Sequence, residues 1–166
     1  MIAITGTPGC GKTTLAGLLR DAGHVVADVK ELAAAQGAIV GHDEQDQSDV
    51  IDVAALTVPA GTDFVEGHLA HLMPCETIWV IRCDPRILET RMQARGYPAA
   101  KIRENLEAEA MDLILQEALA AGVPVTQRDG SQRTPAELLS AFVEAEPATL
   151  NSPDIEPVDW SDWLLG

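Results

Sequence analysis

The stretch Gly6-Thr7-Pro8-Gly9-Cys10-Gly11-Lys12-Thr13 decides how the rest of this sequence is interpreted, because it fits G-x-x-x-x-G-K-[ST] at every fixed position. Glycines let a backbone curl so that its N–H groups point inward and form a nest for anions. A helix that begins near Lys12 would add its positive dipole end. The stretch therefore predicts a loop that binds the phosphates of ATP.

Each position of this loop has an expected role. Lys12 is expected to reach the β- and γ-phosphates as a point charge, and the Thr13 hydroxyl is expected to ligate Mg²⁺, the cofactor that accompanies ATP. Cys10 has two interpretations: a reactive thiol, because helix N-termini lower thiol pKa values, or a position that acts only through its backbone. The predicted nucleotide-binding set in this loop is Gly9, Cys10, Gly11, Lys12, Thr13 and Thr14.

The flanks predict a strand before the loop and a helix after it, and this alternation continues along the chain. The expected strands are Met1–Thr5, His24–Ala27, Asp63–Glu66, Thr77–Cys83 and Val123–Thr126. The expected helices are Lys12–Ala22, Val29–Gln36, one from Pro85 with Asp84 as its N-cap, Pro98–Ala121 and Pro135–Glu146. Gly37–Asp49 is expected to be a loop that leads into a weak helix ending at Leu56.

This alternation predicts a three-layer α/β/α domain over residues 1–146, with a five-stranded parallel sheet in the order 2-3-1-4-5. Residues 147–166 are acidic and proline-spaced, so they are expected to form a tail. Trp160 and Trp163 in this tail favour docking, either on a partner or back onto the domain.

The composition restricts the class of protein. The chain has 166 residues, of which 46% are apolar, and a net charge of −15 from 26 acidic and 11 basic residues. Such a charge repels phosphate backbones, so extensive nucleic-acid binding is not expected. A salt-rich cytoplasm (a halophilic source) would explain the large negative charge, because salt screens the repulsion between acidic residues; the alternative is an ordinary acidic enzyme. Three cysteines that match no zinc spacing, and the lack of any apolar run long enough for a bilayer, predict a cytoplasmic protein.

Beyond the loop, three segments carry a resemblance to a known family. They are Glu66-Gly67-His68-Leu69-Ala70-His71, Arg82-Cys83-Asp84 and Arg91-x-x-x-Arg95-Gly96-Tyr97. Together with the loop, they resemble the archaeal adenylate kinases related to eukaryotic adenylate kinase isoenzyme six. Members of that family are nucleoside monophosphate kinases that are also described as ATPases in small ribosomal subunit maturation. The resemblance covers roughly residues 1 to 143.

The resemblance implies site residues outside the loop. Glu66 would hold the Mg²⁺ shell through water or orient a water molecule, and His68 would position the attacking group or shuttle a proton. Arg91 and Arg95 would close a lid (about 91–101) over ATP and neutralise charge on the transferring group, with Arg95 also binding the nucleotide. The alternatives are a strand-end carboxylate for Glu66, a helix cap for His68, and surface ion pairs with Glu89 and Glu104 for the arginines.

Several weaker assignments complete the predicted site. Arg82 should face the same crevice, and the loop Gln127–Ser131 is a candidate for adenine contact. A metal site from His71 and Cys75 with His68 has no evident fourth ligand.

Two functions remain open at this level. The first is transfer of the ATP γ-phosphate to AMP, giving two ADP, and the second is an ATPase assembly factor that acts on a small-subunit ribosomal protein. A small-metabolite kinase is a third, weaker interpretation. The acceptor-binding segment (about 29–57) contains Lys30 but no arginine, and it carries Asp43, Glu44, Asp46, Asp49 and Asp52. This acidic composition argues against efficient AMP phosphorylation and leaves ATP hydrolysis intact.

Overall fold

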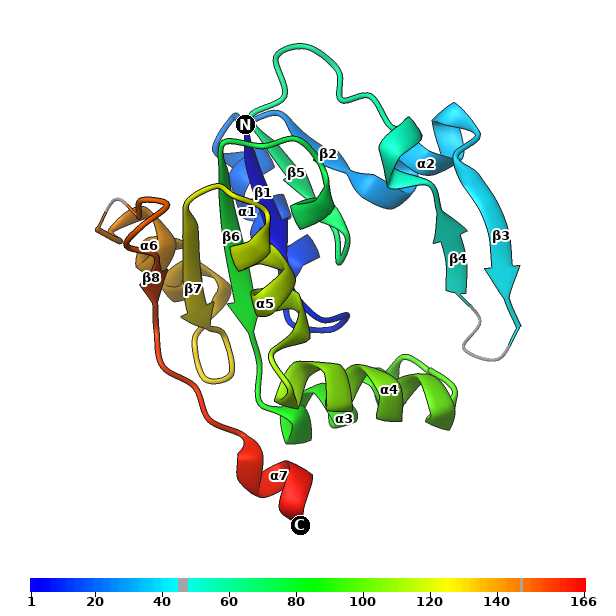
Figure 1. The fold of residues 1–166 in the computed structure, drawn as a ribbon, viewed down its shortest axis with the longest axis vertical. Coiled ribbons are helices and arrows are strands. Elements are labelled where there is room, and N and C mark those ends of the chain that lie inside the picture. The colour runs from blue at the N-terminus through cyan, green and yellow to red at the C-terminus, as the bar shows by residue number, and fades with distance from the viewer. Residues whose placement is uncertain (45–47, 147) are drawn as a thin grey trace.

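A computed structural model describes residues 1–44, 48–146 and 148–166 (Figure 1). Its centre is a six-stranded sheet in which all pairs are parallel. In spatial order the strands are β2 (Val26–Asp28), β5 (Phe64–Glu66), β1 (Ile2–Thr5), β6 (Thr77–Arg82), β7 (Val125–Asp129) and β8 (Asp154–Ile155). The parallel sheet is confirmed, but the prediction of five strands is wrong. The observed order is the predicted order with a sixth strand, β8, added at the edge beside β7.

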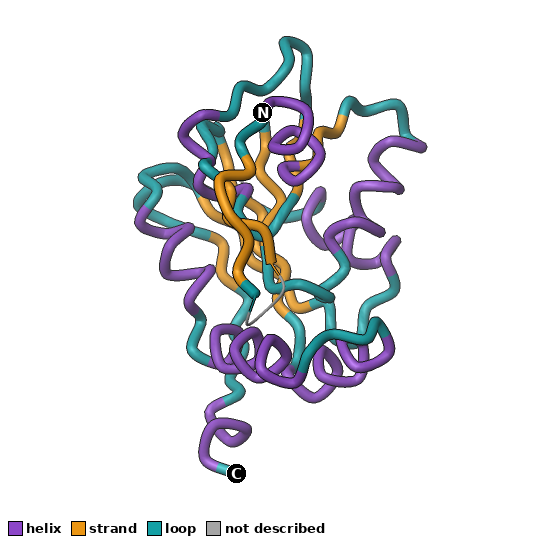
Figure 2. The backbone as a smooth tube through the Cα atoms, turned by 90° about the vertical axis from the view of Figure 1, so that its right-hand side faces the viewer, coloured by secondary structure: helices purple, strands orange, loops and turns teal. Residues whose placement is uncertain are grey.

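Helices cover both faces of the sheet, which gives the expected three layers (Figure 2). The helices are α1 (Lys12–Asp21), α2 (Val29–Gln36), α3 (Pro85–Ala94), α4 (Ala99–Ala110), α5 (Leu113–Ala120), α6 (Pro135–Val143) and α7 (Ser161–Leu165), with 3-10 turns η1 (Val53–Ala55) and η2 (Ala70–Leu72). In the part of the chain that the structure describes, no helix combines the length and apolar character needed to span a membrane.

The alternation of side chains along the strands divides the core into two clusters. Ile4, Phe64 and Trp79 pack with α1 and α6, and Trp79 stacks on Phe142 with the ring centroids 4.8 Å apart. Ala3, Val65, Ile78, Val80 and Val125 point to the other face and pack with α2, α5 and η2. Both faces of the central strands are therefore buried, in agreement with the apolar residues that fill these strands between their polar ends. This core fixes the carboxyl ends of β1, β5 and β6 at one edge.

A β-hairpin replaces the predicted loop after residue 37, and of the predicted weak helix ending at Leu56 the structure contains only the 3-10 turn η1. β3 (Ile39–Asp43) and β4 (Ser48–Ile51) pair antiparallel and form a separate two-stranded sheet that stands away from the main one (Figure 1). Their β-branched residues fit a pleated surface, whereas the acidic residues between them suggested only a polar loop. Asp46, which belongs to the predicted acidic stretch, lies outside the described residues.

The predicted helix Pro98–Ala121 is interrupted in the structure. α4 ends at Ala110, and Asp112 adopts the left-handed conformation with φ of 58° before α5 begins. The Asp112 carboxylate forms an ion pair with the buried Arg82, which explains why a non-glycine residue holds this conformation. Leu113, the first residue of α5, is 41% exposed.

The C-terminal segment, residues 148–166, packs back onto the domain. β8 pairs with β7, and Glu156 forms an ion pair with Arg133 at 2.6 Å. The Trp160 side chain is buried, and Trp163 packs against the core cluster that includes Ile102 and Leu106. Of the two docking alternatives, the structure shows the contact with the chain's own domain. Pro147, the expected first residue of the tail, lies outside the described residues.

Candidate active site

The Gly6–Thr13 loop joins β1 to α1 and owes its shape to glycine. Gly6, Gly9 and Gly11 have φ values of 147°, 90° and 110°. A Cβ on Gly6 would lie 2.4 Å from the Ile81 carbonyl oxygen, so any side chain there would collide with β6. The start of the loop therefore packs directly against β6, the neighbour of β1 in the sheet, and the loop conformation depends on this packing.

Lys12 lies inside this loop. Its ammonium group donates to the Gly6 carbonyl at 2.8 Å and to the Thr7 carbonyl at 3.1 Å, and the residue is 8% exposed. Burial raises the pKa of the neighbouring Cys10 thiol, with partial opposition from Lys12. A buried thiol with a raised pKa is a poor nucleophile, so the geometry favours the backbone role for Cys10.

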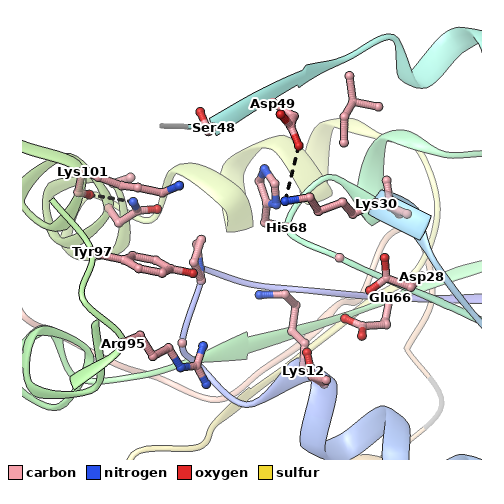
Figure 3. Close-up of a pocket in the computed structure, with 18 of the residues that line it drawn as sticks. Lys12, Asp28, Lys30, Ser48, Asp49, Glu66, His68, Arg95, Tyr97 and Lys101 are labelled. Carbon is pink, nitrogen blue, oxygen red and sulfur yellow. Dashed lines mark hydrogen bonds and ion pairs between the residues drawn. The ribbon is translucent and has the colours of Figure 1, made fainter. Parts of the chain in front are cut away.

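A cleft of about 450 Å³ opens beside the loop (Figure 3). Its walls come from the loop, the ends of β2 and β5, the hairpin, and the segment that joins α3 to α4. The lining residues are Pro8, Gly9, Lys12, Thr13, Asp28, Val29, Lys30, Ser48, Asp49, Ile51, Glu66, Gly67, His68, Arg95, Tyr97, Lys101, Glu104, Asn105 and Ala108. All three lysines of the chain belong to this set. The cleft thus gathers cations in a strongly acidic protein.

Two carboxylates stand side by side at the inner end of the cleft. Glu66 ends β5, is 2% exposed, and is in register with Asp28 at the end of β2. Burial raises the pKa of Glu66 first, the negative charge of Asp28 raises it further, and Lys12 opposes the shift. Sequence reasoning identified Glu66 but missed Asp28. The signal was available, since the ends of neighbouring parallel strands meet at one edge.

His68 lies on the cleft wall between Lys30 and Lys101 (Figure 3). Although the residue stays solvent-accessible, desolvation by the cleft walls lowers its pKa to about 4, and the positive charges of Lys12, Lys101 and Lys30 contribute further. The ring is therefore neutral at pH 7. The cap alternative does not hold, because the residue before η2 is Leu69 and no side-chain cap is present.

His71, unlike His68, is not among the described residues that line the cleft. Its ring is buried, with Nδ1 2.8 Å from the Thr5 hydroxyl and Nε2 2.8 Å from a Glu117 carboxylate oxygen. Within the described residues, no group of three or more His, Cys, Asp or Glu side chains could hold a metal ion. His71 therefore has a structural explanation, as a link between β1 and α5.

The structure separates the two predicted lid arginines. Arg95 lines the cleft as the C-cap of α3, whereas Arg91 lies within α3 and donates to the Gly9 carbonyl at 3.0 Å. Arg91 thus contacts the Gly6–Thr13 loop from α3 and is not among the described residues that line the cleft. Tyr97 and Lys101 join Arg95 on this wall, with the Lys101 ammonium 5.0 Å from the Tyr97 ring centroid. Lys101 and Asn105 were missed because nothing in their spacing distinguishes them from ordinary residues of a solvated helix.

Three other predicted residues, Arg82, Gln127 and Thr14, are outside the set of described residues that line the cleft. Arg82 does not face the cleft: it is 2% exposed and bonded to Glu109, Gln127 and Asp112. Gln127 is also buried and bonded, so its side chain is not available to adenine. Thr14 is exposed but lies outside the set of described residues that line the cleft.

A glycine-rich loop between a central parallel strand and a helix, with Lys12 inside it and a cleft beside it, defines the class of P-loop nucleotide-binding proteins. The family described as "AAA domain" matches residues 2–112. Archaeal relatives carry the name "Putative adenylate kinase". The protein from Methanothermobacter thermautotrophicus is 41% identical, with all of both chains covered. That from Archaeoglobus fulgidus is 45% identical over 87% of this chain and 80% of its own. The chain therefore belongs to this archaeal adenylate kinase family of P-loop proteins.

A third relative agrees with this assignment, and a solved structure agrees with the fold. The relative from Natronomonas pharaonis is 38% identical over 98% of this chain and 99% of its own length. Among solved structures, the YorR protein of Bacillus subtilis, in complex with phosphorylated GDP, matches 86% of this chain and 93% of its own with a TM-score of 0.55. At 14% identity, this second likeness concerns the fold alone. None of these names refers to a ribosomal protein, so that partner remains an expectation from the resemblance.

Proposed function

We propose that this protein is an adenylate kinase that transfers the γ-phosphate of MgATP to AMP and gives two ADP. The observation that carries the proposal is the position of the lysines. A chain with a net charge of −15 has only three, and all of them line one cleft together with Arg95 and the phosphate-binding loop. Converging cations are what two phosphate-bearing substrates need in order to approach each other.

The donor side of the cleft is built from the loop. Lys12 would exchange its contacts with the Gly6 and Thr7 carbonyls for the β- and γ-phosphates. The Thr13 hydroxyl and the Glu66 and Asp28 carboxylates supply only oxygen atoms, the donor type that suits Mg²⁺, and Glu66 would act through water. When bound, Mg²⁺ neutralises charge on the phosphates. Arg95 would approach the transferring group from the lid side.

The acceptor side is built from opposite walls. Lys30 of α2 and Lys101 of α4 face the cleft across His68, and the Lys30 ammonium lies 3.4 Å from Asp49 of the hairpin (Figure 3). The two ammonium groups would replace the arginines that the segment lacks and neutralise the AMP phosphate. An oxygen of that phosphate attacks the γ-phosphorus, and the bond to the β-phosphate oxygen breaks. A neutral His68 can donate to or accept from the attacking group without adding charge.

ATP hydrolysis is a second candidate, favoured by the acidic side of the same cleft. Asp28, Asp49 and Glu104 line it, and the described part of residues 29–57 contributes no arginine. An acceptor phosphate would meet repulsion from these groups, whereas water would not. In that reaction Glu66 and His68 would orient the attacking water molecule.

Stoichiometry separates the two reactions. With MgATP and AMP present, a kinase forms two ADP for each ATP consumed and is silent without AMP. A hydrolase forms one ADP and one phosphate per ATP without any acceptor. Each assay should be run both in dilute buffer and in molar KCl, because salt screens the negative surface charge. An ADP-to-ATP ratio of one that is insensitive to AMP would reject the kinase proposal.

A further inference from the structure

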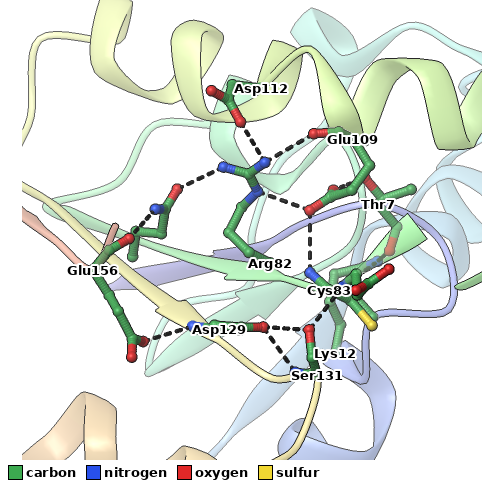
Figure 4. A network of polar contacts seen from close by, with 12 residues as sticks. Thr7, Lys12, Arg82, Cys83, Glu109, Asp112, Asp129, Ser131 and Glu156 are labelled. Atoms are coloured by element: carbon green, nitrogen blue, oxygen red, sulfur yellow. Dashed lines mark hydrogen bonds and ion pairs between the residues drawn. The ribbon is translucent and has the colours of Figure 1, made fainter. Parts of the chain in front are cut away.

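A buried arginine connects the C-terminal segment to the interior of the domain. Arg82 ends β6, and its side chain is 2% exposed. Its Nε donates to the Glu109 carboxylate at 2.8 Å, one terminal nitrogen donates to the Gln127 side chain at 3.0 Å, and the other donates to the Glu109 carbonyl at 2.8 Å and to Asp112 (Figure 4). A guanidinium with so many directed partners has one orientation.

Glu109 transmits that orientation to the phosphate-binding loop. One of its carboxylate oxygens accepts from Arg82 and, at 3.1 Å, from the Cys83 backbone N–H. The other accepts from the Thr7 hydroxyl (Figure 4). Glu109 is 3% exposed and Thr7 1%, so this contact lies behind the loop and away from the cleft.

Thr7 in turn fixes the residues that bind phosphate. Its carbonyl accepts from the Lys12 ammonium at 3.1 Å and from the Cys10 backbone N–H at 3.1 Å. A rotation of the Thr7 backbone would therefore move the lysine and the amide nest together.

The far end of this chain of contacts belongs to residues 148–166. The Trp160 ring covers Arg82, with Cζ 4.8 Å from the ring centroid, and Trp160 is 8% exposed. Gln127, which accepts from Arg82, donates to the Glu156 carbonyl at 2.6 Å. Trp160 thus covers one face of the guanidinium and shields that face from water.

We infer that Trp160 is a positioning residue for the nucleotide-binding loop, acting through Arg82, Glu109 and Thr7. The described residues that line the cleft include none from 148–166, so the effect cannot come from direct contact with nucleotide in that cleft. The C-terminal segment is then a functional part of the phosphate-binding apparatus, and lifting Trp160 from Arg82 loosens the hold on nucleotide.

The affinity for MgADP, measured by calorimetry, gives the first test. We expect Trp160→Leu to raise the Kd about fivefold. Trp163→Leu is the matched control, because Trp163 lies in the same segment but sits beside Ile102 and Leu106 in a groove at α3 and α4. It should change the Kd less than twofold. The double variant Thr7→Val, Trp160→Leu should bind MgADP with a Kd no higher than that of the weaker-binding single variant. The reason is that both substitutions interrupt the same series of contacts. Equal effects of the two tryptophan variants, or multiplying effects in the double variant, would overturn the inference.

A second measurement works even if Trp160→Leu fails to fold. The wild-type chain labelled with 5-fluorotryptophan gives ¹⁹F signals for Trp79, Trp160 and Trp163, which Trp→Phe variants assign. Saturating MgADP should shift the Trp160 signal and leave Trp163 in place, and Thr7→Val should abolish the shift. Binding by calorimetry with a stationary Trp160 signal, or a shift that survives Thr7→Val, would overturn the inference alone. No binding at all would reject the nucleotide site itself, and the inference with it.

Discussion

The two walls of the cleft are held in place in different ways. On the loop wall, Lys12 is 8% exposed and Glu66 2%, and both are fixed by β1, β5 and the core beneath them. On the hairpin wall, every residue of β3 is exposed, and the Lys30 side chain is 72% exposed in its ion pair with Asp49. The proposed donor-phosphate site is thus tied to the global stability of the fold, whereas the proposed acceptor wall depends on a few surface contacts. Substitutions on the two walls should therefore differ in size and in kind.

The largest effect is expected from Lys12→Ala on the loop wall. In the proposed function the Lys12 ammonium group binds the β- and γ-phosphates, so its removal should lower the turnover number about a thousandfold. A coupled assay of ADP formation measures this, and the far-ultraviolet circular dichroism spectrum checks that the variant is folded. Turnover within threefold of wild type would show that the phosphate site lies elsewhere.

Gly6→Ala should lower stability rather than merely slow the reaction. The new Cβ would meet the Ile81 carbonyl oxygen at 2.4 Å, and the φ of 147° is unfavourable for alanine. We expect a loss of about 3 kcal/mol in the free energy of unfolding, measured with urea.

The matched control for Gly6→Ala is Gly17→Ala in α1. A Cβ on Gly17 would meet no atom of another segment within 4 Å, so alanine should stabilise the helix by about 0.5–1 kcal/mol. Equal effects at the two glycines would contradict the view that the core shapes the loop.

Lys30→Ala tests the hairpin wall and should have a smaller, more selective effect. A lost charge-assisted hydrogen bond of about 1.5 kcal/mol corresponds to about a tenfold rise in KM for AMP. The KM for ATP should remain within twofold, because Lys30 lies on the wall opposite the lid. Steady-state kinetics with each substrate varied in turn measures both constants.

Arg103→Ala is the control for Lys30→Ala. Arg103 is a cation of α4 that points to solvent, with its side chain 81% exposed in an ion pair with Glu107. Both KM values should be unchanged. If Lys30→Ala alters the two KM values equally, the separation into donor and acceptor walls is wrong.

The smallest effect is expected from the protonation of His68. Its pKa is lowered from 6.5 to about 4, so between these values the unfolded chain takes up a proton that the folded chain does not. His68 therefore subtracts stability as the pH falls from 6.5 towards 4 and has no effect above that window. The ring proton signal in nuclear magnetic resonance should titrate near pH 4, and His68→Asn should make the acid-side decrease in Tm shallower. A midpoint near 6.5 would show that the ring is not desolvated by the cleft.

Parts of the site were decided by local sequence. The glycines of the phosphate-binding loop, the strand before it and the helix after it follow from conformational preference and periodicity over about twenty residues. The N-cap at Asp84 with Pro85 was predicted for the same reason, and the structure contains it; the capping box of Thr134 and Glu137 at the start of α6 is another local feature of this kind. Such features need no distant partner, because the groups that satisfy them lie within one turn of the helix.

Other parts were decided only when distant segments met. The hairpin was missed because β3 is exposed along its whole length and β4 is only half-buried, so neither strand alternates between buried apolar and exposed polar residues. β8 formed in a segment expected to be a tail because Arg128 pairs with Asp154 and Gln127 with the backbone of Glu156. Helix periodicity gave no sign of the break at Asp112, which depends on Arg82 thirty residues earlier.

The sequence by itself determined the glycine-rich loop that we propose as the phosphate site, because an anion nest is a local backbone structure built from glycine, lysine and threonine in a fixed order. Only the tertiary structure decided that Asp28 stands beside Glu66, that three lysines share one cleft, and that Trp160 lies against Arg82. The physical reason is the distance over which each kind of interaction acts. Conformational preference acts over neighbouring residues, whereas charge pairing and burial act across space between segments that only folding brings together.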